Sequence, residues 1–548
     1  MRIYLSDWLY NAGILGLYNA LKHGDKNVKL KNNYIEFEEE ELVGFEEDYF
    51  NYLMSKNNDN LTSSKIVDRI LSLERFKNVS LTEKDIESIN ELIKYTKDKI
   101  NSNSYKSAFN LVGVTNEVEL IVKELKVIKI SKKQCVDSVK DEVYSQIITL
   151  YKIKDILTRE NTEKYVKAKN VMYDIIDKFW SGVGILHKTK NNDDMYKVYQ
   201  DYFLNSAKVY NKDNKGKYWC MTCNNPLKSL SESYNLSWLE KMGADMNKKS
   251  SHFWNLNGDS YICPICNLVY SCIPLGFNFV LGKGIFINNN SSVKKLLNAN
   301  KTAGKISTVD DVEEQSYFNI LDDMEQDAIE KNRFEIDNIQ VVRYDSENSS
   351  RPYTFNILSK SKLEVIYKYK DILSRLINMY VEIDGYYINL YREVLKRLYE
   401  NRNMYDLIYL LLKKEHGSKT SDYTYVIKNI LRLNLTLNER GGERAMANYY
   451  KIDRFTKYGQ KVKKEYEDKN SENKLAGISY RLLNALKVNN SDKFMDTLIN
   501  SYMYIGMEIP TEFSNVLLND DEFKSAGYAF MVGLQGKNYK ENSEEESK

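Results

Sequence analysis

Residues 220–224 read Cys-Met-Thr-Cys-Asn, and residues 263–267 read Cys-Pro-Ile-Cys-Asn. Each segment holds a pair of cysteines separated by two residues, and a tetrahedral zinc ion is bound by thiolates that are supplied in such pairs. Two pairs in one chain are a far more specific signal than a single pair. The sequence therefore predicts a structural zinc site made by Cys220, Cys223, Cys263 and Cys266.

We expect the metal at this predicted site to have a structural role. Four thiolates fill the coordination sphere of zinc, so the metal would stabilise folding rather than activate water. The second cysteine of each pair is followed by Asn224 or Asn267, and asparagine tolerates the positive φ that a knuckle turn often requires. The alternatives are free buried thiols and a redox dithiol, although a redox pair usually stands alone beside a βαβ pattern.

Further ligands are not required, although two residues are near enough in sequence to be considered. His252 lies in the segment 226–261, which must leave the metal and return to it. Cys272 follows the second pair on an apolar run, where a buried thiol that packs as a small hydrophobe is the expected role. Cys135 stands apart from both pairs.

Composition limits the classes of protein that this chain can represent. With 548 residues, 42% of them hydrophobic, it should form roughly two to four domains. The 79 basic and 77 acidic residues give a net charge of +2, so nucleic acid would have to bind a local patch. No apolar stretch has the length of a membrane span, and we expect a cytoplasmic protein whose thiols stay reduced.

The periodicity predicts an α+β fold that is mostly α-helical. We expect a mainly helical N-terminal domain with a short hairpin over residues 1–214, and a zinc-knuckle and β-containing domain over residues 215–358. A C-terminal helical bundle is predicted for residues 361–540, and a disordered polar tail for residues 541–548.

Local signals place several elements within these domains. Ser6 or Asp7 can cap a first helix, and Thr82 with Asp85 predicts a capping box at the start of another. Hairpins are predicted over residues 28–37, around two asparagines, and over residues 277–287, around two glycines. Residues 339–344 and 353–358 are predicted to form a further pair of strands.

With both cysteine pairs in place, the sequence resembles the CXXC-CXXC (Cst) family of large subunits from type I-B CRISPR systems. Residues 8–17 and the run 274–287, which contains the glycine-bearing hairpin, support the resemblance. The resemblance implies a large subunit of an RNA-guided surveillance (Cascade) complex in antiviral defence. Such a subunit would recognise the protospacer-adjacent motif, support unwinding of target DNA and recruit the nuclease-helicase.

The resemblance also implies partners. These are crRNA, double-stranded target DNA, the backbone and crRNA-processing subunits of the complex, a small helical subunit and the nuclease-helicase. No catalytic role is expected, since none of the four histidines lies in a recognisable catalytic motif. A zinc-stabilised accessory protein of replication or transcription is the alternative, and an enzyme whose active site forms only in space is a third class.

Contacts to DNA are predicted at two places, where lysines can bind phosphate and short amides can read bases. The first follows the glycine hairpin and the second lies on a basic C-terminal helix. The residues are Lys283, Asn288, Asn289, Asn290, Lys294 and Lys295, and then Lys457, Lys461, Lys463 and Lys464. A solvated loop and a solvated lysine face are the alternative interpretations.

One hypothesis concerns internal translation. Arg440, Gly441 and Gly442 can be encoded by a purine run that resembles a ribosome-binding site upstream of Met446. Initiation there would produce residues 446–548 as a separate small helical subunit, which is the use of internal translation that the family resemblance suggests.

Overall fold

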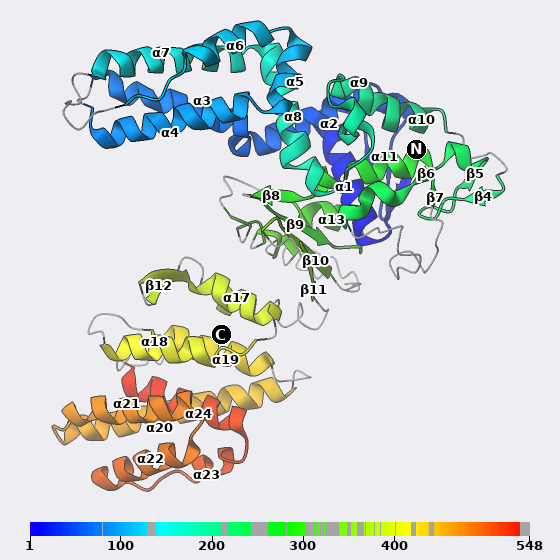
Figure 1. Ribbon diagram of the computed structural model, residues 1–548. Helices are drawn as coiled ribbons and strands as arrows, with labels where there is room; N and C mark the ends of the chain where they lie inside the picture. The colour runs from blue at the N-terminus through cyan, green and yellow to red at the C-terminus, as the bar shows by residue number, and fades with distance from the viewer. Residues whose placement is uncertain are drawn as a thin grey trace. The chain divides into compact units, whose positions relative to one another are not determined.

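The computed structural model divides the chain into two compact units, Met1–Ile357 and Leu358–Lys548 (Figure 1). Both units consist mainly of helices with small antiparallel sheets, so the predicted mostly helical α+β fold is confirmed. The structure describes residues 1–78, 81–129, 139–210, 216–242, 261–280, 282–302, 308, 309, 311–313, 315–317, 319, 320, 323, 339–347, 352–358, 367, 369–376, 379–383, 385–400, 402–417, 423–437 and 443–536.

The chain begins with a three-stranded sheet and a buried helix. Strands β1 (Arg2–Tyr4), β3 (Tyr34–Glu36) and β2 (Lys29–Leu30) lie in that order, and β2 and β3 form the predicted hairpin. Helix α1 (Trp8–His23) is capped by Asp7, whose side chain accepts hydrogen bonds from the N–H groups of Leu9 and Tyr10. One of the two predicted caps is therefore confirmed.

Helix α1 packs very closely on the helices that follow the second cysteine pair, α11 (Pro264–Ser271) and α12 (Ile273–Gly276). A Cβ atom at Gly16 would lie 1.9 Å from the carbonyl oxygen of Cys272, and one at Gly276 would lie 2.1 Å from that of Ala12. Only glycine permits this approach of two backbones. The N-terminal helix is thereby held directly against the cysteine-bearing segment.

A separate hydrophobic cluster joins the helices of residues 62–174. The predicted capping box is present at the start of α4, where Thr82 and Asp85 each accept a hydrogen bond from the other's backbone N–H. The helices of this cluster are α3 (Thr62–Leu71), α4 (Glu83–Ile100), α5 (Asn103–Val112), α6 (Thr115–Glu124), α7 (Lys140–Leu157) and α8 (Glu160–Asp174). Helices α2 (Phe45–Asn57), α9 (Met195–Tyr199) and α10 (Asn205–Lys208) belong to the core that contains α1.

The middle of the chain forms a four-stranded antiparallel sheet in the order β11-β10-β9-β8. Its strands are β8 (Asn278–Val280), β9 (Lys283–Asn288), β10 (Ile339–Asp345) and β11 (Tyr353–Leu358), and α13 (Val293–Ala299) follows β9. Both predicted strand pairs are present. Gly282 has a φ of +81°, which explains the need for glycine in the turn between β8 and β9.

One core spans the boundary at residue 214 that the sequence analysis draws between two domains. Ile3, Leu9 and Phe45 from the N-terminal side belong to the same buried cluster as Cys220 and Cys263. The division of this unit at residue 214 stays a prediction, as does the end of the middle domain at residue 358. The predicted tail, residues 541–548, lies outside the described residues.

The second unit is a helical bundle preceded by a hairpin that the sequence analysis missed. Strands β12 (Tyr380–Ile383) and β13 (Tyr386–Asn389) pair around Gly385, which has a φ of +85°. The helices are α16 (Lys370–Ser374), α17 (Leu390–Glu400), α18 (Tyr405–Gly417), α19 (Thr424–Leu437), α20 (Glu443–Asp468), α21 (Asn473–Lys487), α22 (Ser491–Ile505), α23 (Glu512–Val516) and α24 (Asp520–Gln535).

None of the helices in the described part of the chain has the length and apolar character that a membrane span requires.

Candidate metal centre

The first cysteine pair lies in the tight turn of a short hairpin. Strand β4 (Tyr218–Trp219) leads directly into Cys220, and β5 (Pro226–Leu227) pairs with β4 on the way out. Asn224 adopts the left-handed conformation, with a φ of +54°, and its N–H donates to the carbonyl oxygen of Cys220 at 2.9 Å. The predicted positive φ at this asparagine is confirmed, and it turns the backbone so that both sulfur atoms face inward.

The second pair lies at a helix N-terminus rather than in a turn. Strand β7 (Tyr261–Ile262), paired with β6 (Tyr234–Asn235), leads into Cys263, which caps α11 by accepting a hydrogen bond from the N–H of Cys266 at 3.4 Å. Pro264 occupies the first helical turn, where its missing N–H is tolerated. The positive φ predicted for Asn267 is wrong, because this residue is buried inside the helix.

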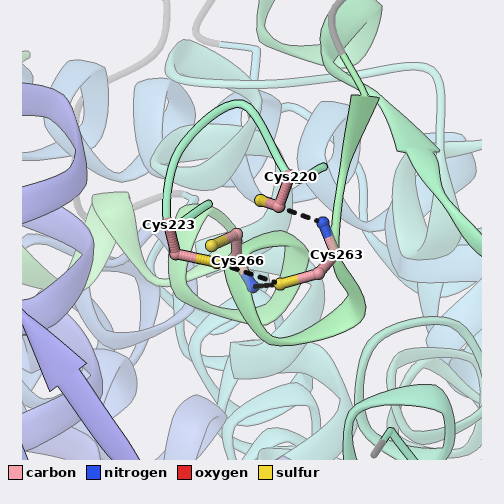
Figure 2. Close-up of side chains that lie close together, drawn as sticks. All are labelled: Cys220, Cys223, Cys263 and Cys266. Carbon is pink, nitrogen blue, oxygen red and sulfur yellow. Dashed lines mark hydrogen bonds between the residues drawn. The ribbon is translucent and has the colours of Figure 1, made fainter. Parts of the chain in front are cut away.

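The two pairs meet with all four sulfur atoms within 4.8 Å of one another. Figure 2 shows the side chains converging, with the loop of Cys220 and Cys223 opposite the helix that carries Cys266. The Sγ atoms of Cys223 and Cys263 are 3.6 Å apart, and the N–H of Cys263 points to the Sγ atom of Cys220 at 3.3 Å. A tetrahedral zinc ion, with Zn–S bonds of about 2.3 Å, would place its sulfur ligands about 3.8 Å apart.

The burial of this cluster favours a bound cation. Cys220, Cys263 and Cys266 are fully buried, and Cys223 is partly buried. Hydrogen bonds from the other three thiols lower the pKa of Cys220, whereas burial raises the pKa of Cys266. Four thiolates in such a site would repel one another unless a positive ion lay between them. The donor set, spacing and burial therefore fit a soft divalent metal ion.

Tyr10 contributes a contact that the sequence analysis missed. Its hydroxyl group lies 3.4 Å from the Sγ atom of Cys266, and its ring packs edge-on against Tyr270. Burial raises the pKa of Tyr10 well above the ordinary value, so the phenol stays protonated and can donate to a thiolate. No sequence spacing connects residue 10 with residue 266, and only the packing of α1 on α11 brings them together.

Comparison with known families supplies the decisive observation. Residues 213–278, which contain both cysteine pairs, match the family model described as CRISPR-associated protein (Cas_CXXC_CXXC). The matched segment belongs to the CXXC-CXXC family of CRISPR-associated proteins. Neither the comparison with curated proteins nor the comparison with solved structures gives a match.

The other candidate ligands fall into two groups. Cys272 is buried outside the group of four, near the hydroxyl groups of Tyr199 and Ser271, and burial raises its pKa to about 12. It is a buried thiol, as expected. Cys135 and His252 lie outside the described residues.

The first group of predicted DNA contacts divides by burial. Asn288 and Asn289 are buried, and the amide of Asn288 accepts from Asn11 at 2.9 Å and donates to Gln340 at 3.0 Å. These two side chains stabilise the end of β9, and this geometry gives no support to a role in base reading. Lys283, Asn290 and Lys294 are exposed and Lys295 is half-buried. Lys283 forms an exposed ion pair with Asp345 at 3.3 Å.

The second group of predicted DNA contacts lies on α20. Lys457, Lys461 and Lys464 are exposed, make no ion pair with a described residue, and lie at helical spacing on one face. Lys463 points elsewhere, since its ammonium donates to the carbonyl oxygen of Gly536 at 2.6 Å and lies 3.7 Å from Glu467. Three of the four predicted lysines therefore form a continuous basic stripe.

Proposed function

We propose that this CRISPR-associated protein is the large subunit of a type I-B RNA-guided surveillance complex, with zinc as a structural ion at its four cysteines. The observation that carries the proposal is the match of the CXXC-CXXC family model to the segment that forms the thiol cluster. In RNA-guided recognition, base pairing reads the target sequence while protein reads the adjacent motif and holds the DNA backbone. A binding subunit without turnover fits that division of labour.

A catalytic role is not part of this proposal. Four thiolates would leave zinc no open position for water or substrate. The chain would instead recognise the protospacer-adjacent motif, support strand separation and recruit the separate nuclease-helicase. Its partners would be crRNA, target DNA and the other subunits of the effector complex.

Two surfaces are proposed to contact DNA. The exposed Lys283, Asn290 and Lys294 would contact DNA near the adjacent motif. The lysine stripe of α20, Lys457, Lys461 and Lys464, would follow the backbone of the displaced strand. Because both contacts would be electrostatic, we expect them to weaken steeply with salt.

The hypothesis of internal translation from Met446 gains a structural argument. Met446 lies in the first turn of α20, so the shorter product would contain α20 to α24. Helices α20 and α24 pack closely, since a Cβ atom at Gly533 would lie 1.9 Å from the carbonyl oxygen of Thr456. The product would lack α18, whose Tyr405 stacks on Tyr528 of α24 with ring centroids 5.8 Å apart. It would therefore expose an apolar face that suits assembly with a partner.

Co-purification of the tagged chain from its own operon tests the proposal. We expect a guide-length RNA with repeat-derived ends and other Cas subunits to accompany the protein. A zinc-containing protein that purifies without RNA or Cas partners would instead support an accessory protein of replication or transcription. Replacing Met446 by Leu should remove a small co-purifying product, and an unchanged product would reject internal translation.

A further inference from the structure

A polar groove with a volume of about 490 Å³ lies in the first unit between α1, α2 and α13. Three lysines line it, Lys56, Lys294 and Lys301, together with Tyr18, Tyr52 and Asn19. No aspartate or glutamate is among the described residues of its lining. Its volume is within the range of ordinary ligand sites, which is about 300–1,000 Å³.

We call this cavity the α1–α13 groove. Its three lysines differ in how many contacts their ammonium groups make with the protein. Lys294 and Lys301 are exposed, and neither forms an ion pair with a described residue. Lys56 is held in place, because its ammonium donates to the carbonyl oxygen of Phe277 at 3.1 Å and lies 5.4 Å from the ring centroid of Tyr52. The groove thus combines one fixed positive charge with two that are free to meet a ligand.

One described acidic residue, Asp323, contacts a residue of the lining. The carboxylate of Asp323 accepts a hydrogen bond from the side-chain amide of Asn298 at 2.8 Å, and Asp323 is only 7% exposed. Three ammonium groups remain around the groove itself. A groove with this charge is suited to an anionic ligand.

The two tyrosines narrow the class of anion. Tyr18 and Tyr52 are both half-buried, so each presents part of its ring to the groove. Proteins that bind single-stranded nucleic acid combine a basic groove with aromatic rings on which bases stack. A duplex is too wide for a cavity of this volume, whereas one or two unpaired nucleotides have a suitable size.

We infer that the α1–α13 groove binds a segment of single-stranded nucleic acid, with Lys56, Lys294 and Lys301 at the phosphates and Tyr18 beneath a base. Lys294 is also one of the predicted DNA contacts, but the inference does not depend on the proposed role in a surveillance complex. It concerns a binding site that the isolated full-length chain should display by itself.

Binding of labelled 12-nucleotide single strands, one of RNA and one of DNA, to the purified chain tests the inference. We expect the double variant Lys294→Glu, Lys301→Glu to bind at least tenfold more weakly at low salt. The slope of log affinity against log salt should fall by about 1.4, since each phosphate contact on a single strand contributes about 0.7. The matched control is Lys84→Glu, Lys106→Glu, which reverses two exposed lysines on α4 and α5. The control should change binding less than twofold.

Substitution at Tyr18 separates stacking from general loss of charge. Tyr18→Ala should weaken binding about tenfold, and Tyr18→Phe should restore it, because stacking requires the ring and not the hydroxyl group. Equal binding by the groove variant and the control would overturn the inference. The inference would also be overturned if the chain bound inorganic triphosphate but neither of the two single strands, since the groove would then hold only a small anion. Loss of RNA co-purification with groove binding intact would count against the effector role alone.

Discussion

The cores of the two units are made of different kinds of side chain. In the first unit the sulfur atoms of Cys220, Cys263 and Cys266 lie fully buried among apolar side chains, with an N-terminal helix packed over them. The second unit contains no cysteine, and its helices meet through apolar side chains and glycine contacts such as that of Gly533 with Thr456. The thiol cluster makes the first core suited to a bound cation, whereas the described part of the second unit offers no cysteine cluster and packs mainly through apolar side chains.

The two units also differ in the groups that stabilise a buried positive charge. The ammonium of Lys169, in the first unit, is buried and donates to the carbonyl oxygen of Asn191 at 2.8 Å. The guanidinium of Arg397, in the second, is buried between the carboxylates of Glu393 and Asp406. A charge that meets a neutral acceptor is stabilised less than one that meets two carboxylates. The stability of the first unit should therefore depend more on metal and pH.

The largest expected effect comes from removing one thiol. Cys263→Ser should abolish metal binding and destabilise the first unit by an amount on the order of 5 kcal/mol, because structural zinc contributes directly to folding. Hydrogen exchange should rise in the first unit and stay unchanged in the α20–α24 bundle. The control Cys272→Ala, which removes the buried thiol outside the cluster, should retain the metal. Equal metal content in Cys263→Ser and wild type would reject the assigned site.

The second effect tests close helix packing in both units. Gly16→Ala and Gly533→Ala would each place a Cβ atom 1.9 Å from a carbonyl oxygen, and each should destabilise its own unit by about 3 kcal/mol. Gly477 is the control, since a Cβ there meets nothing within 4 Å, and Gly477→Ala in α21 should stabilise by about 1 kcal/mol. Chemical denaturation curves measure all three, and a neutral Gly16→Ala would contradict the packing of α1 on α12.

These packing contacts mark the limit of what the sequence could predict. The knuckle ligands, the capping box of Thr82 and the glycine hairpin before β9 were predictable, because each depends on residues close together in sequence. The approach of Gly16 to Cys272 and of Tyr10 to Cys266 was not predictable, since it depends on tertiary packing across most of the first unit. The β12–β13 hairpin could have been found from the Asp-Gly dipeptide at 384–385 in the sequence, which is a common hairpin signal.

Asn267 and Asn288 show that residue type alone does not predict the local geometry of a side chain. Asn267 follows a second cysteine, as Asn224 does, yet Pro264 and the cap at Cys263 start a helix there instead of a turn. Asn288 has the residue type of a base reader, yet its position at the end of β9 places its amide in internal hydrogen bonds. Residue type predicted the available chemistry in both cases, and local geometry decided its use.

A smaller effect concerns pH. Burial lowers the pKa of Lys169 to about 8, below the unfolded value of about 10.4. The unfolded state therefore binds more protons between these values, and stability should rise as pH increases from about 8 to 10.4. Lys169→Met should flatten this rise by about 2 kcal/mol, whereas the exposed control Lys197→Met should not. Thermal unfolding of the three proteins at pH 7 and pH 10 measures the difference, and parallel profiles would contradict it.

The smallest effect is expected at Tyr10. Tyr10→Phe removes the hydroxyl group that lies 3.4 Å from the Sγ atom of Cys266, and it should cost about 1 kcal/mol in stability. Release of the metal to a chelator should become several-fold faster, because the thiolate loses a hydrogen-bond donor. The control is Tyr270→Phe, because the hydroxyl group of Tyr270 lies 3.1 Å from the hydroxyl group of Thr222 and not beside a cysteine of the cluster. Equal rates of metal release in the two variants would show that the hydroxyl group of Tyr10 does not stabilise the metal centre.

The most direct test of the metal centre is X-ray absorption at the zinc edge, combined with elemental analysis of the purified full-length chain. We predict one zinc ion per chain, bound by four sulfur atoms at about 2.3 Å. Substoichiometric metal, or a ligand shell that contains nitrogen or oxygen, would contradict the assignment of Cys220, Cys223, Cys263 and Cys266 as a closed structural site.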